Sequence, residues 1–176
     1  MSTPPAYHHG DLRQSVLQKA GEILEKEGLE ALSVRELARR AGVSHNAPYR
    51  HFPDRASLRA ALAAEGFEML AGALRSRPQR EMGEAYIGFA LAHPERFRLM
   101  FNGLAGLEPR HRATYEALFD SFAVLGEDAQ YAAAGAWALM HGLSHLLLDG
   151  HFATEERKSF VRSVLGSVRF SAPRKS

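Results

Sequence analysis

Apolar residues recur every three to four positions along most of this chain, and polar residues fill the positions between them. This spacing matches the turn of an α-helix, so one face of each segment is apolar and the opposite face is polar. No segment shows the sustained two-residue alternation, rich in β-branched side chains, that predicts a strand. The pattern therefore predicts an all-α fold.

The segment from Ser33 to Phe52 is the most informative part of this pattern, because it predicts two short helices around a tight turn. Ser33 is an N-cap with Glu36 three residues later, a capping box in which each side chain is expected to satisfy the other's backbone N–H. Gly42 follows where a left-handed residue would end the first helix. Ser44 is positioned to begin the second. This is the sequence form of a helix-turn-helix unit.

Further helices are predicted on both sides of this unit. One precedes it and ends at Gly28, and a long one follows with Asp54 as its N-cap. The run Ser76-Arg77-Pro78 then interrupts the pattern. We therefore expect an N-terminal helix-turn-helix domain over residues 1–54, a connecting helix over 54–75 and a C-terminal helical domain over 76–176. The helices expected outside the unit are 11–28, 54–74, 81–92, 94–101, 109–125, 127–148 and 155–165, the last capped by Thr154.

The composition sets the outer bounds of the interpretation. With 176 residues and 45% hydrophobic content, the chain is long enough to bury a core in one or two domains. It has no apolar run long enough to span a bilayer, and Met1 to Asp11 does not resemble a signal peptide. The absence of cysteine excludes disulfides, thiolate metal sites and cysteine nucleophiles. We expect a soluble, cytoplasmic protein without a membrane partner.

The net charge is only +2, but the positive charge is unevenly placed. Six arginines lie between Arg35 and Arg59, against the two acids Glu36 and Asp54. Electrostatic binding to DNA needs such a local concentration of positive charge, although a solvated helical face can carry the same residues. The sequence has no glycine-rich phosphate loop, no nucleophile elbow and no paired carboxylates with a defined partner. It therefore argues against an enzyme, and no catalytic residue or cofactor is expected.

Two blocks of the chain resemble a known family. The block GLEALSVRELARRAGVSHNAPYRHFPDRASLRAAL, preceded by YHHGDLR, resembles the DNA-binding domain of the tetracycline repressor (TetR) family of bacterial regulators. The stretch AYIGFALAHPERFRLMF and the later WALMHGL, with Trp137, His141 and Gly142, resemble the C-terminal domain of a subgroup known for a Trp-His-Gly signature. Together the two blocks cover most of the chain.

This resemblance implies a homodimer of all-helical subunits that binds a pseudopalindromic operator in double-stranded DNA. The N-terminal domains would occupy successive major grooves, with half-sites roughly 34 to 36 Å apart or a multiple of that distance. The C-terminal domain would supply the dimer interface and a pocket for a small apolar or aromatic effector. Release of the operator by the effector, and so repression of transcription, is what the family leads us to expect.

The resemblance also implies DNA contacts for individual residues at the matching positions of this chain. Ser33 can present its hydroxyl and the helix N-terminus to a phosphate, or it only caps the helix. Asn46 could bridge an adenine and the Ala47 methyl could touch a thymine methyl, or both are solvated surface residues. Arg50 could reach a guanine or a phosphate. The residues expected to bind DNA are Ser33, Ser44, His45, Asn46, Ala47, Tyr49, Arg50, His51 and Arg55, of which Tyr49, His51 and Arg55 are expected to grip the phosphate backbone.

Pro48 is an unexpected residue in the second helix of the helix-turn-helix unit. Proline has no N–H donor and disfavours helical geometry in the residue before it, so it is tolerated only near the start of a helix. We therefore expect the recognition helix to begin near Asn46 or Ala47, or else to be locally distorted. Phe52 is expected to anchor the segment in the small core instead of touching DNA.

Aromatic residues recur at helical spacing in the C-terminal half. The same residue types line an apolar pocket and fill a dry helical core, and the sequence does not distinguish the two. The expected ligand-binding residues are Phe89, Phe97, Phe101, Phe122, Trp137 and His141. Trp137 and His141 also share one helical stripe with Ser144, His145 and Leu148, which is either pocket wall or dimer interface.

Two histidine patterns invite a metal interpretation and are better explained otherwise. His141 and His145 share a helical face, but no third ligand is spaced to join them. Glu108 and His111 form one Glu-x-x-His motif, whereas di-iron bundles need two. No metal is expected. The alternatives kept open are a DNA-binding regulator without a ligand, a helical protein that has lost DNA binding, and a helical metal-binding protein or enzyme.

Overall fold

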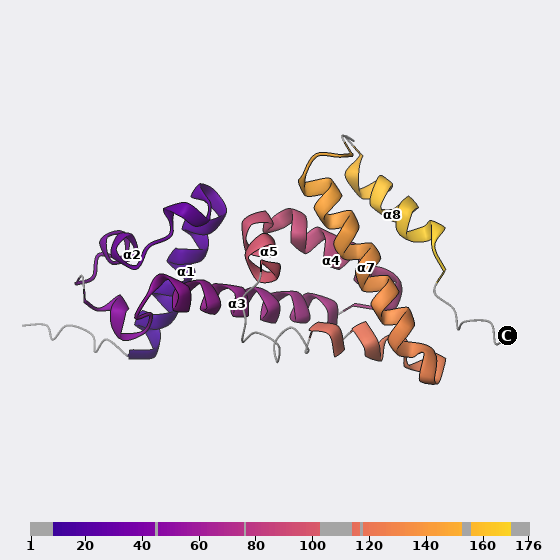
Figure 1. Cartoon of the computed structure of the whole chain (residues 1–176), viewed down its shortest axis with the longest axis horizontal. Helices are drawn as coiled ribbons and strands as arrows, with labels where there is room; N and C mark the ends of the chain where they lie inside the picture. Colours follow the sequence, from indigo (N-terminus) through magenta and orange to yellow (C-terminus); the bar gives the residue numbers. More distant parts are fainter. Residues whose placement is uncertain are drawn as a thin grey trace, which may run out of the picture. The chain divides into compact units, whose positions relative to one another are not determined.

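The computed structural model describes residues 9–44, 46–75, 77–102, 114–116, 118–152 and 156–169, and within these ranges all regular structure is helical (Figure 1). The predicted all-α fold is confirmed. The elements are α1 (His9–Glu27), η1 (Leu29–Ala31), α2 (Val34–Ala41), η2 (Pro48–Arg50), α3 (Arg55–Arg75), α4 (Gln79–Ala92), α5 (Pro94–Phe101), η3 (Ala123–Asp128), α7 (Ala129–Leu148) and α8 (Arg157–Ser167), where η denotes a 3-10 helix.

The chain divides into two compact units that do not follow the sequence order. The first unit holds α1, η1, α2, η2, the part of α3 up to Glu65, and α5 from Glu95 onward. The second holds the remainder of α3 from Gly66, together with α4, η3, α7 and α8. The continuous helix α3 therefore contributes to both units. The domain limits expected from the sequence, 1–54 and 76–176, remain a prediction about functional domains.

One apolar face of α1 forms the centre of the first unit. Val16, Ala20 and Leu24 are fully buried on it, at spacings of four residues. Burying a large apolar side chain contributes about 1.5 to 3 kcal/mol, which is far more than helix propensity supplies at one position. Gly28 ends α1 with a φ of 80°, and its N–H donates to the carbonyl of Leu24 at 3.0 Å.

α5 is fixed to the first unit by charged groups. The backbone N–H groups of Glu95 and Arg96 each donate to the carboxylate of Glu25 in α1, at 3.2 Å. The Arg96 guanidinium is buried, with the residue 6% exposed, and it donates to Glu65 of α3 at 2.6 Å. A Cβ added to Gly21 of α1 would clash with Nη2 of Arg96. The absence of a side chain at Gly21 therefore leaves space for the Arg96 guanidinium beside α1.

The second unit is built on the packing of α4 against α7 and α8. α7 buries four alanines toward the core, and the small side chains permit close approach of a neighbouring helix. Tyr86 and Ile87 of α4 are 1% exposed, and Met140 of α7 is 3% exposed. The apolar side chains of these helices supply the main stabilising contribution to this unit.

The observed ends of several helices differ by a few residues from the expected ones. α4 begins at Gln79 instead of residue 81, and α7 begins at Ala129 because the 3-10 helix η3 occupies the preceding residues, with Gly126 at a φ of 60°. α8 covers Arg157–Ser167 instead of 155–165, and Thr154 lies outside the described residues. Of the helix expected over 109–125, residues 114–116 and 118–120 are helical and a turn follows at 121–122.

Asp54 caps α3 as expected, because its Oδ1 accepts the backbone N–H of Ser57 at 2.6 Å. This hydrogen bond lowers the pKa of the Asp54 carboxyl. The interruption of the helical pattern near Pro78 is also confirmed, since Pro78 directly precedes the first residue of α4. Among the described helices, none combines the length and the apolar content that crossing a membrane requires.

Candidate nucleic-acid interface and ligand pocket

The start of α2 is capped as expected, but the capping box is only half formed. The N–H of Glu36 donates to Oγ of Ser33 at 3.1 Å. The Glu36 carboxylate does not return to Ser33; it accepts hydrogen bonds from Arg39 at 2.6 and 2.9 Å and from Arg40 at 2.5 Å. The reciprocal half of the predicted box is therefore wrong. Hydrogen bonds between two charged groups are stronger than one to a neutral backbone N–H, so the carboxylate binds the arginines instead.

Gly42 ends α2 in the left-handed conformation that the sequence predicts, with φ 65° and ψ 26°. Its N–H donates to the carbonyls of Ala38 and Arg39, and the N–H of Val43 donates to the Ala38 carbonyl at 3.2 Å. These bonds form a Schellman motif, which satisfies the last carbonyls of the helix and reverses the chain. The turn of the helix-turn-helix unit is thereby fixed by backbone geometry.

The segment after the turn is not an α-helix. It forms the 3-10 helix Pro48–Arg50, preceded by a turn in which the Ala47 N–H donates to the Ser44 carbonyl at 3.0 Å. In an α-helix that carbonyl would accept the N–H of residue 48, which is proline and has none. Ala47 nevertheless has helical angles, φ −64° and ψ −46°. Helical geometry thus begins where expected, but Pro48 limits it to a tighter and shorter element.

Several residues expected to bind DNA lie on the outside of this segment. Ser44, Asn46, Tyr49 and Arg50 are exposed, whereas Ala47 and His51 are half-buried. His45 lies outside the described residues. The turn and the short helix therefore present a small group of hydroxyl, amide, phenol and guanidinium side chains.

Phe52 anchors the same segment in the core of the first unit, which confirms that the residue has the core position expected from the sequence. Its side chain is 1% exposed. The Arg13 guanidinium carbon lies 5.4 Å from the centre of the Phe52 ring, a cation–π geometry, and the His51 ring meets Phe52 edge-on. The sequence did not indicate the role of Arg13, because residues so far apart in the chain carry no local signal of their contact.

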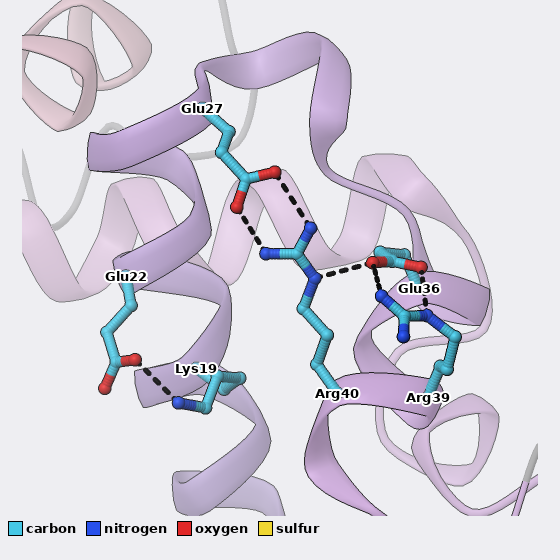
Figure 2. A network of polar contacts seen from close by, with 6 residues as sticks. All are labelled: Lys19, Glu22, Glu27, Glu36, Arg39 and Arg40. Atoms are coloured by element: carbon cyan, nitrogen blue, oxygen red, sulfur yellow. Dashed lines mark hydrogen bonds and ion pairs between the residues drawn. The ribbon is translucent and has the colours of Figure 1, made fainter.

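An ion-pair network joins α1 to α2 on the exposed side of the unit (Figure 2). Arg40 bridges Glu27 of α1 and Glu36 of α2, and Arg39 also binds Glu36. These hydrogen bonds, from Arg39 first and Arg40 second, lower the pKa of Glu36 to about 2. The hydrogen bond from Arg40 likewise lowers the pKa of Glu27. Arg39 and Arg40 are therefore each paired with a neighbouring carboxylate.

This pairing reduces the positive charge that the motif can offer to DNA. Arg55 is also engaged, because its Nη2 donates to the carbonyl of Leu29 at 2.7 Å and lies 3.3 Å from the Glu30 carboxylate. Arg35 and Arg50 are exposed and have no carboxylate partner among the described residues. Of the arginines in the motif, these two remain best placed to attract a phosphate.

A chain of polar contacts crosses the core of the second unit. The indole Nε1–H of Trp137 donates to the Tyr86 hydroxyl at 3.0 Å, and that hydroxyl lies 3.0 Å from Nδ1 of His141. An indole can only donate, so the Tyr86 hydroxyl accepts from Trp137, and the same hydroxyl shares a hydrogen bond with His141 whose direction depends on the tautomer of that imidazole. Burial raises the pKa of the Tyr86 phenol. The sequence pattern identified Trp137 and His141 but missed Tyr86 as the group that joins them.

The six residues expected to bind a ligand do not share one site. Phe122 lines a cavity of about 320 Å³ and Phe89 lines a separate hollow of about 760 Å³. Trp137 and His141 instead meet at the Tyr86 hydroxyl. Phe97 and Phe101 pack on each other in α5, with ring centres 5.0 Å apart.

The smaller cavity lies within the second unit, among α4, α7, α8 and residues 118–122. Its apolar lining comes from Met82, Leu118, Phe122, Met140 and Leu165. Polar groups also border it, namely Gln79, Arg80, Ser121 and Arg169. A mostly apolar cavity with a few polar groups is the usual form of a small-molecule site.

The histidine patterns do not form a metal site in the part of the chain that the structure describes. His141 and His145 are adjacent, with ring centres 4.7 Å apart, but no group of three potential ligands occurs among the described residues. The motif of Glu108 and His111 lies outside those residues.

Comparison with known proteins identifies both halves of the chain. The model for bacterial regulatory proteins of the tetR family matches residues 16–62, and the model for the tetracyclin repressor-like C-terminal domain matches residues 79–167. The chain is 27% identical over 154 residues to the uncharacterised HTH-type transcriptional regulator Rv0681 of Mycobacterium tuberculosis, covering 78% of this chain and 71% of that protein.

Solved structures agree with these matches. A protein of unknown function from Rhodococcus sp. RHA1 is 34% identical, with a TM-score of 0.76 over 93% of this chain and 94% of that one. A TetR variant from Acinetobacter baumannii AYE, solved in complex with minocycline, shares the fold at 22% identity, with a TM-score of 0.61 over 92% of this chain and 96% of that one. The Trp-His-Gly subgroup stays a prediction, but the capped turn, the two matching models and these relatives together show that the chain belongs to the TetR family of transcriptional regulators.

Proposed function

We propose that this chain is a homodimeric, DNA-binding repressor that leaves a pseudopalindromic operator when a small molecule binds its C-terminal half. The observation that carries the DNA-binding part is the Gly42 turn, after which Ser44, Asn46, Tyr49 and Arg50 are all exposed on one short segment. Residues 1–54 form the DNA-binding domain in this proposal, 54–75 the connecting helix, and 76–176 the domain for dimerisation and ligand binding.

Each of the proposed DNA-binding residues has a role that suits its chemistry. Asn46 reads a base edge, Tyr49 and His51 donate to phosphate oxygens, and Arg50 reaches a guanine or a phosphate. Ser33, at the N-terminus of α2, directs backbone N–H groups at a further phosphate. Arg55 has a smaller part than the sequence suggests, because its guanidinium already binds the Leu29 carbonyl.

Because the reading element is only a short 3-10 helix, one subunit can touch few base edges. Two-fold symmetry doubles the contacts and so raises both affinity and specificity. An exposed stripe of small and apolar residues on α7 supports a homodimer. This stripe consists of Tyr131, Ala134, Ala138, Gly142 and Leu146, which recur at spacings of three and four residues.

Effector binding and DNA binding are coupled in this proposal because the effector has different affinities for two arrangements of the dimer. If the effector binds one arrangement of the dimer better than another, it shifts the population toward that arrangement. A change of a few ångströms in the spacing of the two reading segments would remove them from successive grooves. The TetR structure with minocycline is a precedent for a small molecule bound to this fold.

The DNA-binding proposal is tested by selecting bound sequences from a randomised duplex library and measuring affinity for the selected duplex by fluorescence anisotropy. We expect Tyr49→Phe combined with Arg50→Gln to weaken binding by roughly tenfold or more, since each loses a contact to DNA, and to reduce the salt dependence. Lys158→Gln is the matched control for charge, because Lys158 is exposed in α8 of the second unit. No enrichment in the selection, or equal effects of both variants, would refute the proposed interface.

The dimer proposal is tested separately by light scattering at micromolar concentration. Ala138→Glu places a charge on the exposed stripe of α7 and should yield a folded monomer. Ala92→Glu is the control, because Ala92 is exposed on α4. A wild-type protein that is monomeric over this range would contradict the two-subunit model.

A further inference from the structure

The cavity of about 320 Å³ in the second unit combines an apolar interior with positive charge at its border. We propose that it binds a small amphipathic organic acid, with the hydrocarbon part against Met82, Phe122 and Met140 and the carboxylate at Arg169. This inference rests on the proposed effector function and names the class of molecule.

The apolar part of the cavity comes from segments that are far apart in sequence. Met82 of α4, Met140 of α7 and Phe122 before η3 are each less than a tenth exposed, so their side chains are already held by the surrounding core. Methionine adapts its shape easily, which suits contact with a flexible hydrocarbon chain. An alkyl or aryl group placed here would exchange water for apolar contacts without reorganising the unit.

The charge at the border favours an anion over a cation. Arg169 donates from Nη1 to the carbonyls of Gly166 at 2.7 Å and of Val168 at 3.2 Å, which holds the guanidinium at the end of α8. Arg80, which also lines the cavity, pairs with the Glu81 carboxylate at 3.3 Å, and both side chains are exposed. Such an exposed pair is weak. No carboxylate is among the described residues that line the cavity.

The larger hollow of about 760 Å³ has a smaller excess of positive charge, because Glu81 and Glu84 line it together with Arg77, Arg80 and Arg162. Arg162 and Glu84, which both line it, are paired at 3.1 Å. Glu81 also lines it and lies within 3.9 Å of Arg77. An incoming anion would therefore meet two carboxylates, so this hollow is the weaker candidate although it is larger.

The size of the cavity further restricts the ligand. Its volume is at the lower end of the range of about 300 to 1,000 Å³ that holds small molecules in proteins. Gly83 and Leu165 both line the cavity and lie next to each other. A Cβ added to Gly83 would lie 2.8 Å from Cδ1 of Leu165. A larger residue at position 83 must push Leu165 aside, which gives a way to change the cavity without touching its charges.

The test is calorimetric titration of the full chain with decanoic acid, decan-1-ol and decylamine as probes. We expect the acid to bind and the alcohol to bind at least about tenfold more weakly, because it lacks the hydrogen bond between two charged groups. The amine should not bind. Arg169→Gln should reduce affinity for the acid to that for the alcohol, whereas Arg162→Gln, on the other hollow, should leave the affinity for the acid unchanged.

Gly83→Val provides an independent check, since it should weaken binding of the acid and the alcohol alike. Circular dichroism establishes that each variant is folded. Failure of the acid to bind, or equal binding of acid and alcohol to the wild-type protein, would overturn the inference. If the acid binds but leaves operator affinity unchanged in fluorescence anisotropy, the proposed release mechanism fails while the assignment of the cavity stands.

Discussion

Nη1 of Arg96, at the start of α5, donates to the Glu65 carboxylate in α3 at 2.6 Å, and both side chains are mostly buried. Two helices that are separated by α4 in the sequence are joined by this pair. Arg96 also donates to the Leu62 carbonyl at 3.3 Å, so the guanidinium has two partners in the same helix. The first unit therefore depends on a charged contact inside its core.

Replacing Arg96 by methionine should destabilise the protein strongly. The substitution keeps much of the side-chain volume but leaves Glu65 partly buried without its cation, a change that typically costs about 3 to 5 kcal/mol. Urea unfolding followed by circular dichroism measures the loss. The control is Lys19→Met, which removes the exposed pair with Glu22 and should cost less than about 1 kcal/mol. Similar losses for both variants would show that burial of the pair does not matter.

Gly42→Ala should lower the free energy of unfolding by about 1 kcal/mol or more, because alanine disfavours the left-handed angles of this residue. Gly72→Ala is the matched control. Gly72 lies inside α3, and an added Cβ would meet no atom within 4 Å. The control should therefore be stabilised by about 0.5 to 1 kcal/mol. Equal effects at the two sites would argue against the Schellman turn.

Acid should remove the contribution of Glu36 to stability. Its pKa is held at about 2 by Arg39 and Arg40, below the ordinary value of 4.5. A carboxyl with a lowered pKa stabilises the folded state above its unfolded pKa, and this stabilisation disappears as the pH falls through the folded pKa. The Tm difference between wild type and Glu36→Gln should thus be largest near pH 7 and shrink between pH 4.5 and pH 2.

Comparing the two proteins at each pH cancels the titration of the other carboxylates. The same difference should decrease with added salt, because the network in Figure 2 is exposed to solvent. A Tm difference that stays constant from neutral pH to strong acid would contradict the pairing of Glu36 with the two arginines.

Tyr86→Phe should cost about 1 to 2 kcal/mol, because Trp137 and His141 both lose the hydroxyl that joins them. Trp137 is the single tryptophan of the chain, so its emission reports this site directly. We expect a shifted emission maximum together with a lower urea midpoint. Tyr49→Phe is the control, since Tyr49 is 38% exposed and belongs to the first unit. An unchanged spectrum for Tyr86→Phe would show that the hydrogen bond from the indole is absent in solution.

Features set by neighbouring residues were predictable from the sequence. The cap at Ser33, the left-handed Gly42, the Asp54 cap and the break near Pro78 each depend on residues within four positions. Local hydrogen bonding and backbone sterics decide them, and both can be recognised in a short window. The helical period likewise predicted the order of the helices.

Features set by distant residues were not predictable in the same way. The helical period cannot show that Glu25 binds the first N–H groups of α5, or that Arg13 lies over Phe52. Nor does it show which aromatic residues line a cavity, because core and pocket use the same residue types. Phe122 borders the smaller cavity, while Arg169 lies beyond every residue proposed from the sequence.

The discontinuous first unit restricts how regulators of this kind can be recombined. A chimera joined at residue 76, with the first part from this chain and the rest from a relative, would separate Arg96 and the α5 N-terminus from their partners Gly21, Glu25 and Glu65. A donor with a different residue at position 96 would leave the Glu65 carboxylate without its cation. In the reverse chimera, a first part from a relative without glycine at position 21 would clash with the Arg96 guanidinium. Hybrid proteins that exchange N-terminal and C-terminal halves should therefore carry these contact positions as a set.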